Sequence, residues 1–335
     1  MKKIAIIGAG LQARRRVPPI VADENYDVAL VIDIFEPNAK SLAETCGAAY
    51  GIDWKEVITD ESIDAVLVLT FPDTHAEISI AAMEAGKDVL CEKPLARTAE
   101  EAAKMVESAV KNKRILKCGF NLRHHPAIAE AHRLFQEGKI GTAAFGRGIY
   151  GIAGREDMTK EWRTKPELSG GGEFMDQGVH LIDLLRWFLG DVEQASGMVS
   201  TTVWPIEPLE DNGFALLRHE GGVTSSVHTS LTQWVNKFEF EIYGREGFLT
   251  ISGLGGGYGV EKLIVGHRDP EGLFQYTTYE YRRGDESWQL DWEEFKTAME
   301  SREAPSADGV AGHKVLEAVE AVYESSTSGK TINLK

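Results

Sequence analysis

Residues 3–13 of the chain read Lys-Ile-Ala-Ile-Ile-Gly-Ala-Gly-Leu-Gln-Ala, and this stretch decides the fold. A short apolar run is followed by glycines at positions 8 and 10 and an alanine at position 13, the spacing of a dinucleotide-binding turn. Gly8 permits the tight turn, Gly10 lets the backbone approach a pyrophosphate, and Ala13 keeps the next helix close to the strand. The N–H groups that begin this helix favour phosphates, so we predict a site for NAD or NADP. We expect the cofactor to contact Gly8, Gly10, Leu11 and Gln12.

The choice between the two cofactors depends on Asp33, which ends a second apolar run, residues 28–33. A carboxylate at this distance after the glycines accepts hydrogen bonds from a ribose diol and repels a 2′-phosphate. Ile34 follows rather than Arg or Ser, so the pattern favours NAD, with Asp33 and Ile34 in the cofactor site. The basic run 14–16 is either a solvated helix face or a positive field for an anionic ligand, and this second alternative leaves NADP open.

Strand and helix signals alternate through the first third of the chain. Short apolar runs predict strands at 3–7, 28–33, 65–69, 88–92 and 115–119. Helices are predicted at 37–46, 74–85 and 98–111. Repeated units of this length form a doubly wound parallel sheet with right-handed crossovers.

The pattern changes near residue 120. Alternating apolar and polar residues predict strands at 140–152, 193–205, 212–220, 223–232, 237–244, 247–251, 260–267 and 274–282. Helices are predicted at 126–137, 173–189, 287–301 and 309–325. We expect an α/β protein with the parallel sheet in residues 1–120. Residues 121–335 should form an α+β domain with a large, mostly antiparallel, open-faced sheet, and helix 309–325 is a candidate to pack back on the first domain.

Composition narrows the class of protein. The 335 residues suit two domains, and 36 basic against 52 acidic residues give a formal net charge of −16. The sequence has no Lys/Arg-rich block, which argues against nucleic-acid binding. Three cysteines without a CxxC pair indicate a reducing compartment, and no apolar window approaches the ~18 residues of a membrane span. We therefore expect a cytoplasmic protein that binds neither nucleic acid nor membrane.

A second motif, Glu92-Lys93-Pro94, follows the fourth predicted strand. Ligands of open α/β sheets lie beyond the carboxyl ends of the strands, so Lys93 is expected at the nicotinamide site. Pro94 fixes the backbone where the chain turns. A lysine in this position would hydrogen-bond a substrate hydroxyl and ease its deprotonation. The alternative is a surface lysine at the end of a strand.

A third motif lies in residues 169–183, where three glycines precede a predicted helix and would let the backbone approach a ligand. Asp176 and His180 are four residues apart and share a helix face, with Asp183 on roughly the same side. A histidine with a carboxylate one turn away is a candidate proton acceptor, and a helix salt bridge is the simpler alternative. The spacing shows no third ligand for a metal here or beside His124-His125, so no metal is predicted.

Together, the glycine turn, Glu92-Lys93-Pro94 and Asp176-x-x-x-His180 resemble, in order and spacing, the Gfo/Idh/MocA oxidoreductases. The resemblance covers essentially the whole chain and extends to segments 70–75, 86–89 and 119–123. It implies an N-terminal Rossmann domain and a C-terminal domain whose open-faced sheet often forms dimers or tetramers. It also implies hydride transfer between NAD(P) and a hydroxyl carbon of a sugar, inositol or sugar derivative.

The resemblance also implies roles for individual residues. Lys93 would contact the reacting oxygen and the nicotinamide ribose, His180 would be the general acid/base, and Asp176 would bind substrate. The cofactor pocket would further be lined by Glu92, Thr70, Pro72 and His75. The substrate would further be contacted by Asn121, Arg123, Trp162 and Arg163. In the last pair, the arginine would hold a carboxylate or phosphate, and the tryptophan would either stack on a sugar ring or belong to the core.

Three functions fit these motifs. The first is a sugar or cyclitol dehydrogenase. The second keeps the cofactor but oxidises a sugar, eliminates a glycosidic substituent and reduces the sugar again, without net redox. The third is a non-catalytic, cofactor-binding regulator, against which the set of Lys93, Asp176 and His180 argues. The substrate stays open, because the shape of the pocket depends on loops 150–170 and 200–212.

Overall fold

The structure, a computed structural model, describes residues 1–269 and 271–334, which form two compact units. The first unit comprises Met1–Phe120 and Trp288–Leu316. The second comprises Asn121–Ser287 and the chain from Glu317 onward. The sequence pattern suggested a division into 1–120 and 121–335, whereas the structure groups Trp288–Leu316 with the first unit.

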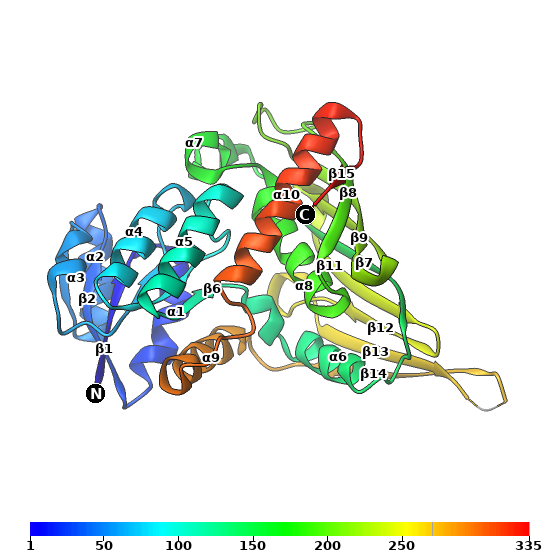
Figure 1. Ribbon diagram of the computed structural model, residues 1–335, viewed down its shortest axis with the longest axis horizontal. Coiled ribbons are helices and arrows are strands. Elements are labelled where there is room, and N and C mark those ends of the chain that lie inside the picture. Colours follow the sequence, from blue (N-terminus) through cyan, green and yellow to red (C-terminus); the bar gives the residue numbers. More distant parts are fainter. Residues whose placement is uncertain (270, 335) are drawn as a thin grey trace. The chain divides into compact units, whose positions relative to one another are not determined.

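The first unit contains a six-stranded parallel sheet in the order β3-β2-β1-β4-β5-β6. This unit includes the N-terminal part of the chain, drawn in blue to cyan in Figure 1. Its strands are β1 (Lys2–Ile7), β2 (Tyr26–Ile32), β3 (Ala49–Gly51), β4 (Ala65–Val68), β5 (Asp88–Cys91) and β6 (Leu116–Cys118). Its helices are α1 (Leu11–Val21), α2 (Glu36–Cys46), α3 (Lys55–Thr59), α4 (Pro72–Glu84), α5 (Ala99–Asn112) and α9 (Ser287–Ser301). The strand order reverses between β1 and β4, which confirms the predicted doubly wound sheet.

The core of the first unit explains why α9 belongs to it. The apolar runs of β1 and β4 are buried, as expected of central parallel strands. Trp292, Phe295 and Met299 of α9 are buried in the same hydrophobic cluster as Ile4 of β1. Each such side chain contributes roughly 1.5–3 kcal/mol when it is fully buried, so the cluster holds a helix that lies late in the sequence.

Within the described residues, the second unit contains a nine-stranded sheet in the order β14-β13-β12-β11-β7-β10-β9-β8-β15. Its strands are β7 (Ala143–Ala153), β8 (Val192–Ser200), β9 (Asn212–His219), β10 (Thr224–Ser230), β11 (Thr232–Gly244), β12 (Gly247–Ser252), β13 (Glu261–Arg268), β14 (Phe274–Tyr281) and β15 (Ile332–Asn333). Strands β7 and β10 pair in parallel, and the other neighbouring pairs are antiparallel. The sheet is therefore mostly antiparallel, as predicted.

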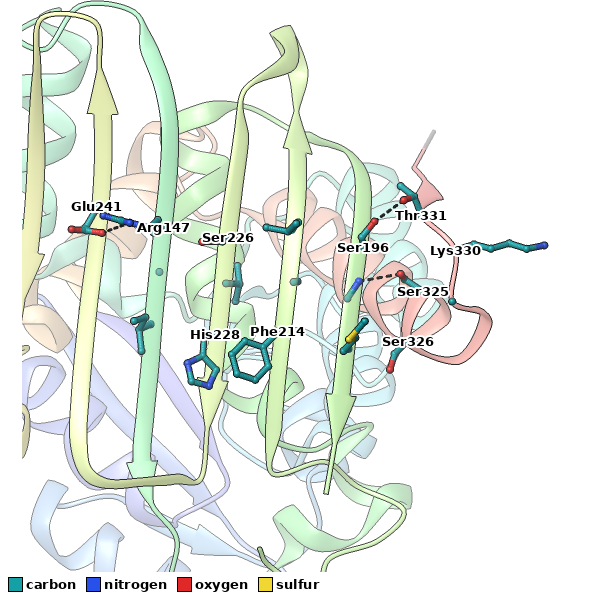
Figure 2. Close-up of a pocket in the computed structure, with 18 of the residues that line it drawn as sticks. Arg147, Ser196, Phe214, Ser226, His228, Glu241, Ser325, Ser326, Lys330 and Thr331 are labelled. Atoms are coloured by element: carbon teal, nitrogen blue, oxygen red, sulfur yellow. Dashed lines mark hydrogen bonds and ion pairs between the residues drawn. The ribbon is translucent and has the colours of Figure 1, made fainter. Parts of the chain in front are cut away.

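One face of this sheet is covered by helices. Helix α8 (Val179–Leu189) lies against β7, and α6 (Pro126–Gln136) lies against β12 and β13. Gly146 and Gly148 of β7 leave room for α8, since a Cβ added at Gly148 would lie 2.8 Å from Cδ2 of Leu181. The other face carries exposed side chains such as Phe214 and Leu216, which confirms the open-faced sheet (Figure 2).

The helices differ from the predicted ones in a few places. The predicted helix 173–189 begins as a π-helical turn, Phe174–Gly178, and continues as α8. Helix α7 (Pro166–Ser169) precedes it, and α10 (Gly309–Ser328) is divided between the units after Leu316. Among the described residues, no helix has the length and apolar character needed to cross a membrane.

His132 of α6 provides a test of the packing against α8. Its ring stacks on Trp187 with centroids 3.5 Å apart, and Nε2 lies 3.3 Å from the carbonyl oxygen of Trp187. Burial lowers the pKa of His132 to about 4, so the folded protein keeps the ring neutral where the unfolded chain would already be protonated.

We expect His132 to stabilise the fold fully above pH ~6.5 and to lose this contribution as the pH falls toward ~4. Because the side chain is only partly buried, the loss should be about 1–2 kcal/mol. The variant His132→Phe keeps the aromatic stack but cannot titrate at this position. Its free energy of unfolding in urea should therefore depend less on pH than that of the wild type. If the free energies of unfolding of the two proteins changed equally with pH between pH 7 and 4.5, His132 would not make the contribution described here.

Candidate cofactor and catalytic sites

The predicted cofactor turn has the geometry of a dinucleotide cradle. Gly8 has φ +97°, and a Cβ there would lie 2.6 Å from the carbonyl carbon of Leu69, so only glycine fits. Gly10 has φ −80°, and a Cβ at this residue would meet nothing within 4 Å. Gly10 also begins α1, and no side chain caps that end of the helix. Open space and helix N–H groups therefore coincide at Gly10, which fits a pyrophosphate.

Asp33 lies beside this turn. One carboxylate oxygen accepts the N–H of Ala9 at 2.7 Å, and the other accepts the N–H of Phe35 at 2.8 Å. These bonds orient the carboxylate, and each oxygen keeps a further lone pair for a ribose hydroxyl. Its neighbour Ile34 is largely exposed, and so is Leu11 in the first turn of α1. The residues present therefore fit the adenosine side of NAD.

The residues after β4 are organised around His75. Its imidazole is buried, with Nδ1 3.0 Å from the carbonyl oxygen of Pro94 and Nε2 3.1 Å from that of Thr70. Burial lowers the pKa of His75. Pro72 begins α4, and the Thr74 hydroxyl donates to the Thr70 hydroxyl at 2.7 Å. His75 thus links the loop after β4 to the loop after β5 through backbone carbonyls.

Lys93 follows β5, and its segment is anchored by the buried carboxylate of Glu92. Glu92 accepts the backbone N–H of Lys93 at 3.1 Å, and its side chain is ion-paired with Arg16. Arg14 and Arg15 are exposed, as a solvated helix face would be, but Arg16 is buried. Neither alternative for the basic run 14–16 anticipated the burial of Arg16, because the carboxylates that Arg16 contacts are distant in the sequence.

In the second unit, Asp176 lies in the π-helical turn and His180 in the first turn of α8. The i→i+5 pattern of a π-helix alters the α-helical spacing on which the shared-face argument relied. Asp176 accepts a hydrogen bond from Nε of Arg163 at 3.0 Å. His180 is buried, with its ring centroid 6.1 Å from that of Tyr150.

Tyr150 is a residue that the sequence did not single out. It lies on the covered face of β7, and its hydroxyl interacts with Tyr258. Burial raises the pKa of Tyr150 well above its ordinary value, so the phenol stays a hydrogen-bond donor. Strand alternation marks it only as one of many inward-facing residues, which is why the sequence carried no separate signal.

The glycines before Asp176 serve packing. A Cβ at Gly172 would lie 2.3 Å from the carbonyl oxygen of Glu210, and one at Gly171 would lie 2.4 Å from the Tyr323 hydroxyl. The Glu210 carboxylate accepts the N–H of Gly172 at 3.2 Å and that of Phe174 at 2.9 Å, and the Tyr323 hydroxyl donates to it at 2.7 Å. From the sequence, we expected these glycines to let the backbone approach a ligand. In the structure they let the backbone approach Glu210.

The predicted substrate residues divide into two groups. Arg123 forms a buried, bidentate pair with Asp183, with Nε 2.8 Å from one oxygen, and Asn121 donates to the Ser287 hydroxyl at 2.9 Å. These two side chains are engaged inside the second unit. Trp162 and Arg163 are only partly buried, and the guanidinium of Arg163 lies 4.5 Å from the Trp162 ring centroid. This second group stays accessible beside Asp176.

In the comparison with known proteins, part of each unit matches a family model. Residues 2–120 match the family model described as an oxidoreductase family with an NAD-binding Rossmann fold. Residues 128–250 match the model of the GFO/IDH/MocA C-terminal domain. Together the two models cover most of the chain, in the order that the motifs implied.

Relatives of known name support the match. Inositol 2-dehydrogenase 3 of Saccharopolyspora erythraea is 30% identical over 73% of this chain and 71% of its own length. The 1,5-anhydro-D-fructose reductase of Ensifer adhaerens is 29% identical over 100% of this chain and 99% of its own. Levoglucosan dehydrogenase of Pseudarthrobacter phenanthrenivorans is 33% identical over 60% of this chain, a match that spans 58% of that protein.

Solved structures agree in fold. A levoglucosan dehydrogenase in complex with NADH and levoglucosan has a TM-score of 0.92 at 24% identity, covering 99% of each chain. An oxidoreductase domain protein from Kribbella flavida has a TM-score of 0.90 at 25% identity, covering 100% of each chain. With the two family models and the cradle at Gly8 and Gly10, these similarities lead to one conclusion: the chain belongs to the Gfo/Idh/MocA family of NAD-binding oxidoreductases.

Proposed function

We propose that this protein is a dehydrogenase that transfers a hydride between NAD and a hydroxyl carbon of an uncharged sugar or inositol. The observation that carries the proposal is the dinucleotide cradle at Gly8 and Gly10, after β1, with the backbone of Lys93 fixed at the end of β5 in the same sheet. The second unit adds a buried histidine and a carboxylate, His180 and Asp176, at the start of one helix. NADP is the alternative cofactor of this proposal.

The proposed chemistry gives each residue one task. Oxidation of an alcohol releases a proton from the hydroxyl and a hydride from the carbon, and the nicotinamide, when bound, accepts the hydride. His180 takes the proton as general base, and Lys93 hydrogen-bonds the reacting oxygen. Asp176 accepts a hydrogen bond from a second substrate hydroxyl. The reverse reduction uses the same groups.

The charge on Arg163 favours an uncharged substrate. Its guanidinium is already paired with Asp176 at 3.0 Å and faces Glu161 at 3.8 Å. An arginine whose charge is compensated in this way attracts a sugar carboxylate or phosphate less than an unpaired one. The named relatives act on levoglucosan, 1,5-anhydro-D-fructose and inositol, which are uncharged. Trp162 supplies an aromatic face for a sugar ring, and Asn121 and Arg123 support the surrounding structure.

The two other functions considered from the sequence receive less support. The relatives described above are named as dehydrogenases or a reductase, and none of these names describes a glycosidase or a regulator. We therefore retain net oxidation and reduction as the proposal. We also retain the cytoplasmic location, on the grounds that Cys46, Cys91 and Cys118 are all free thiols.

The cofactor cradle gives the first test of this proposal. In Gly10→Ala the methyl group would meet no atom of the described residues within 4 Å, so we expect an unchanged free energy of unfolding. The methyl would occupy the space assigned to the pyrophosphate, and the Kd for NADH, measured by fluorescence titration, should rise about tenfold or more. Gly284→Ala, which also meets nothing within 4 Å, is the matched control. Equal NADH affinity in Gly10→Ala and Gly284→Ala would refute the cradle assignment.

The second test addresses catalysis and substrate charge together. With NAD and a panel of levoglucosan, myo-inositol, D-xylose, D-glucuronate and glucose 6-phosphate, we expect NADH formation with at least one of the three uncharged compounds. Lys93→Met should lower kcat/KM by about 10²–10⁴-fold and change NADH binding far less. Lys111→Met, at an exposed lysine of the same unit, should behave as wild type. Turnover confined to the two anionic sugars would contradict the argument from Arg163, and full turnover by Lys93→Met would contradict its catalytic role.

We further propose that copies of this chain form a dimer or tetramer through the open face of the second sheet. Exposed Met198, Phe214 and Leu216 line a hollow of about 830 Å³ on that face, together with His228, which stacks on Phe214 (Figure 2). Apolar side chains gathered on one sheet face are typical of an interface.

The oligomer can be tested by light scattering after gel filtration. The wild type should have at least twice the mass of one chain. Met198→Lys combined with Leu216→Lys should shift the mass toward that of a monomer, because two buried lysines would oppose association. Val110→Lys, at an exposed apolar residue of the first unit, serves as control. A monomeric wild type, or an unchanged mass in the double variant, would exclude this interface.

A further inference from the structure

Arg16 lies in the interior of the first unit, where it joins four parts of the chain. Its side chain is only 2% exposed and forms ion pairs with Glu92, after β5, and with Asp291 of α9. It also donates to the carbonyl oxygen of Gly119, after β6, at 3.4 Å. The indole of Trp288 lies 4.8 Å from the guanidinium. The helix that carries Arg16 is the one that begins at the cofactor turn.

The pair with Glu92 extends to Lys93. One oxygen of the Glu92 carboxylate accepts from Nε of Arg16, and the other accepts the backbone N–H of Lys93 at 3.1 Å. Glu92 is 4% exposed, and a carboxylate buried to this degree requires a compensating cation. Arg16 therefore compensates the buried carboxylate of Glu92 and holds it in place, and Glu92 in turn holds the peptide of Lys93.

Several features make arginine the residue that fits this position. Its planar fork reaches two carboxylates at once, which the single ammonium of lysine does not do with the same geometry. Room for the fork depends on Gly119, because a Cβ there would lie 2.5 Å from Nη2 of Arg16. Burial alone would lower the pKa of Arg16, but Glu92 and Asp291 raise it above its ordinary value, so the guanidinium stays charged.

We propose that Arg16 is a positioning residue for hydride transfer, which through Glu92 fixes the backbone of Lys93 relative to the cofactor turn. The proposal rests on the function proposed above for Lys93. In this role Arg16 acts on Lys93 through the carboxylate of Glu92. Loss of Arg16 should therefore impair turnover more than cofactor binding.

Lys117 provides a matched control within the same charge network. It is a fully buried cation of β6 that pairs with Asp291 at 3.0 Å and with Glu294. No ion pair between Lys117 and Glu92 is found among the described residues. Lys117→Met thus removes a buried cation from the network and leaves the contact between Arg16 and Glu92 present. If the network served stability alone, Lys117→Met and Arg16→Met would have similar consequences.

The direct test is amide hydrogen exchange of the peptide that contains Lys93, which needs no substrate. In Arg16→Met and in Glu92→Gln, exchange at Lys93 should accelerate about tenfold or more, because its acceptor is lost or displaced. In Lys117→Met it should stay within about twofold of the wild type. Arg16→Lys should restore part of the protection. If Arg16→Met does not fold, Glu92→Gln still tests the bond to Lys93.

Turnover of whichever panel sugar is oxidised gives the second measurement. We expect kcat to fall about tenfold or more in Arg16→Met, with NADH affinity within about threefold and kcat near wild type in Lys117→Met. The Arg16→Met, Glu92→Gln double variant should lose no more kcat than the worse single variant, since both act through one contact. Equal losses of kcat in Lys117→Met and Arg16→Met, or unchanged exchange at Lys93, would overturn the proposal. Full activity in Lys93→Met, with the exchange pattern as expected, would instead overturn the function assigned to Lys93.

Discussion

The close contact between Gly8 and the backbone of Leu69 is the constraint on which the first unit depends. Gly8 donates its N–H to Ile32 at 2.8 Å, and Leu69 donates to Ile7 at 2.7 Å, so the turn is bonded to both neighbouring strands. A side chain at position 8 would push β1 away from the end of β4. The loops that follow β2 and β4 carry Asp33 and Thr70, and the backbone N–H of Glu92 donates to Val68 of β4. Glycine is required here by packing, before any ligand is considered.

Most of the fold could be predicted from local pattern. Buried parallel strands are continuous apolar runs, so β1, β2, β4 and β5 were identified within about two residues of their ends. The strands of the second sheet were found because one covered face imposes alternation. Strand β3 was missed because it has only three residues, of which Ala49 and Tyr50 are exposed. Helix α9 was found, but its membership of the first unit depends on tertiary packing that no local pattern encodes.

The candidate site was predictable only in part, for a related reason. Motifs locate a side chain along the chain, whereas its charge state and orientation depend on partners that can lie anywhere. Arg16 meets Asp291, and Glu210 meets Tyr323, across more than a hundred residues in each case. Buried polar contacts of this kind, whether ion pairs or hydrogen bonds to a carboxylate, contribute little net stability, because desolvation offsets most of the attraction. Their effect is on geometry: they restrict a segment to one conformation, as Glu210 does for the turn before Asp176.

Two of the glycines of β7, Gly146 and Gly148, give the second unit a mechanical property. With no side chains at positions 146 and 148, the leucines of α8 rest directly on the sheet backbone. The helix and the strand backbone are therefore in direct contact at these two positions, and close packing of this kind transmits strain. A displacement of β7 at these positions would therefore be transmitted to α8, the helix that carries His180. At these two positions, only the backbone of β7 separates the open face of the sheet from α8, which carries His180.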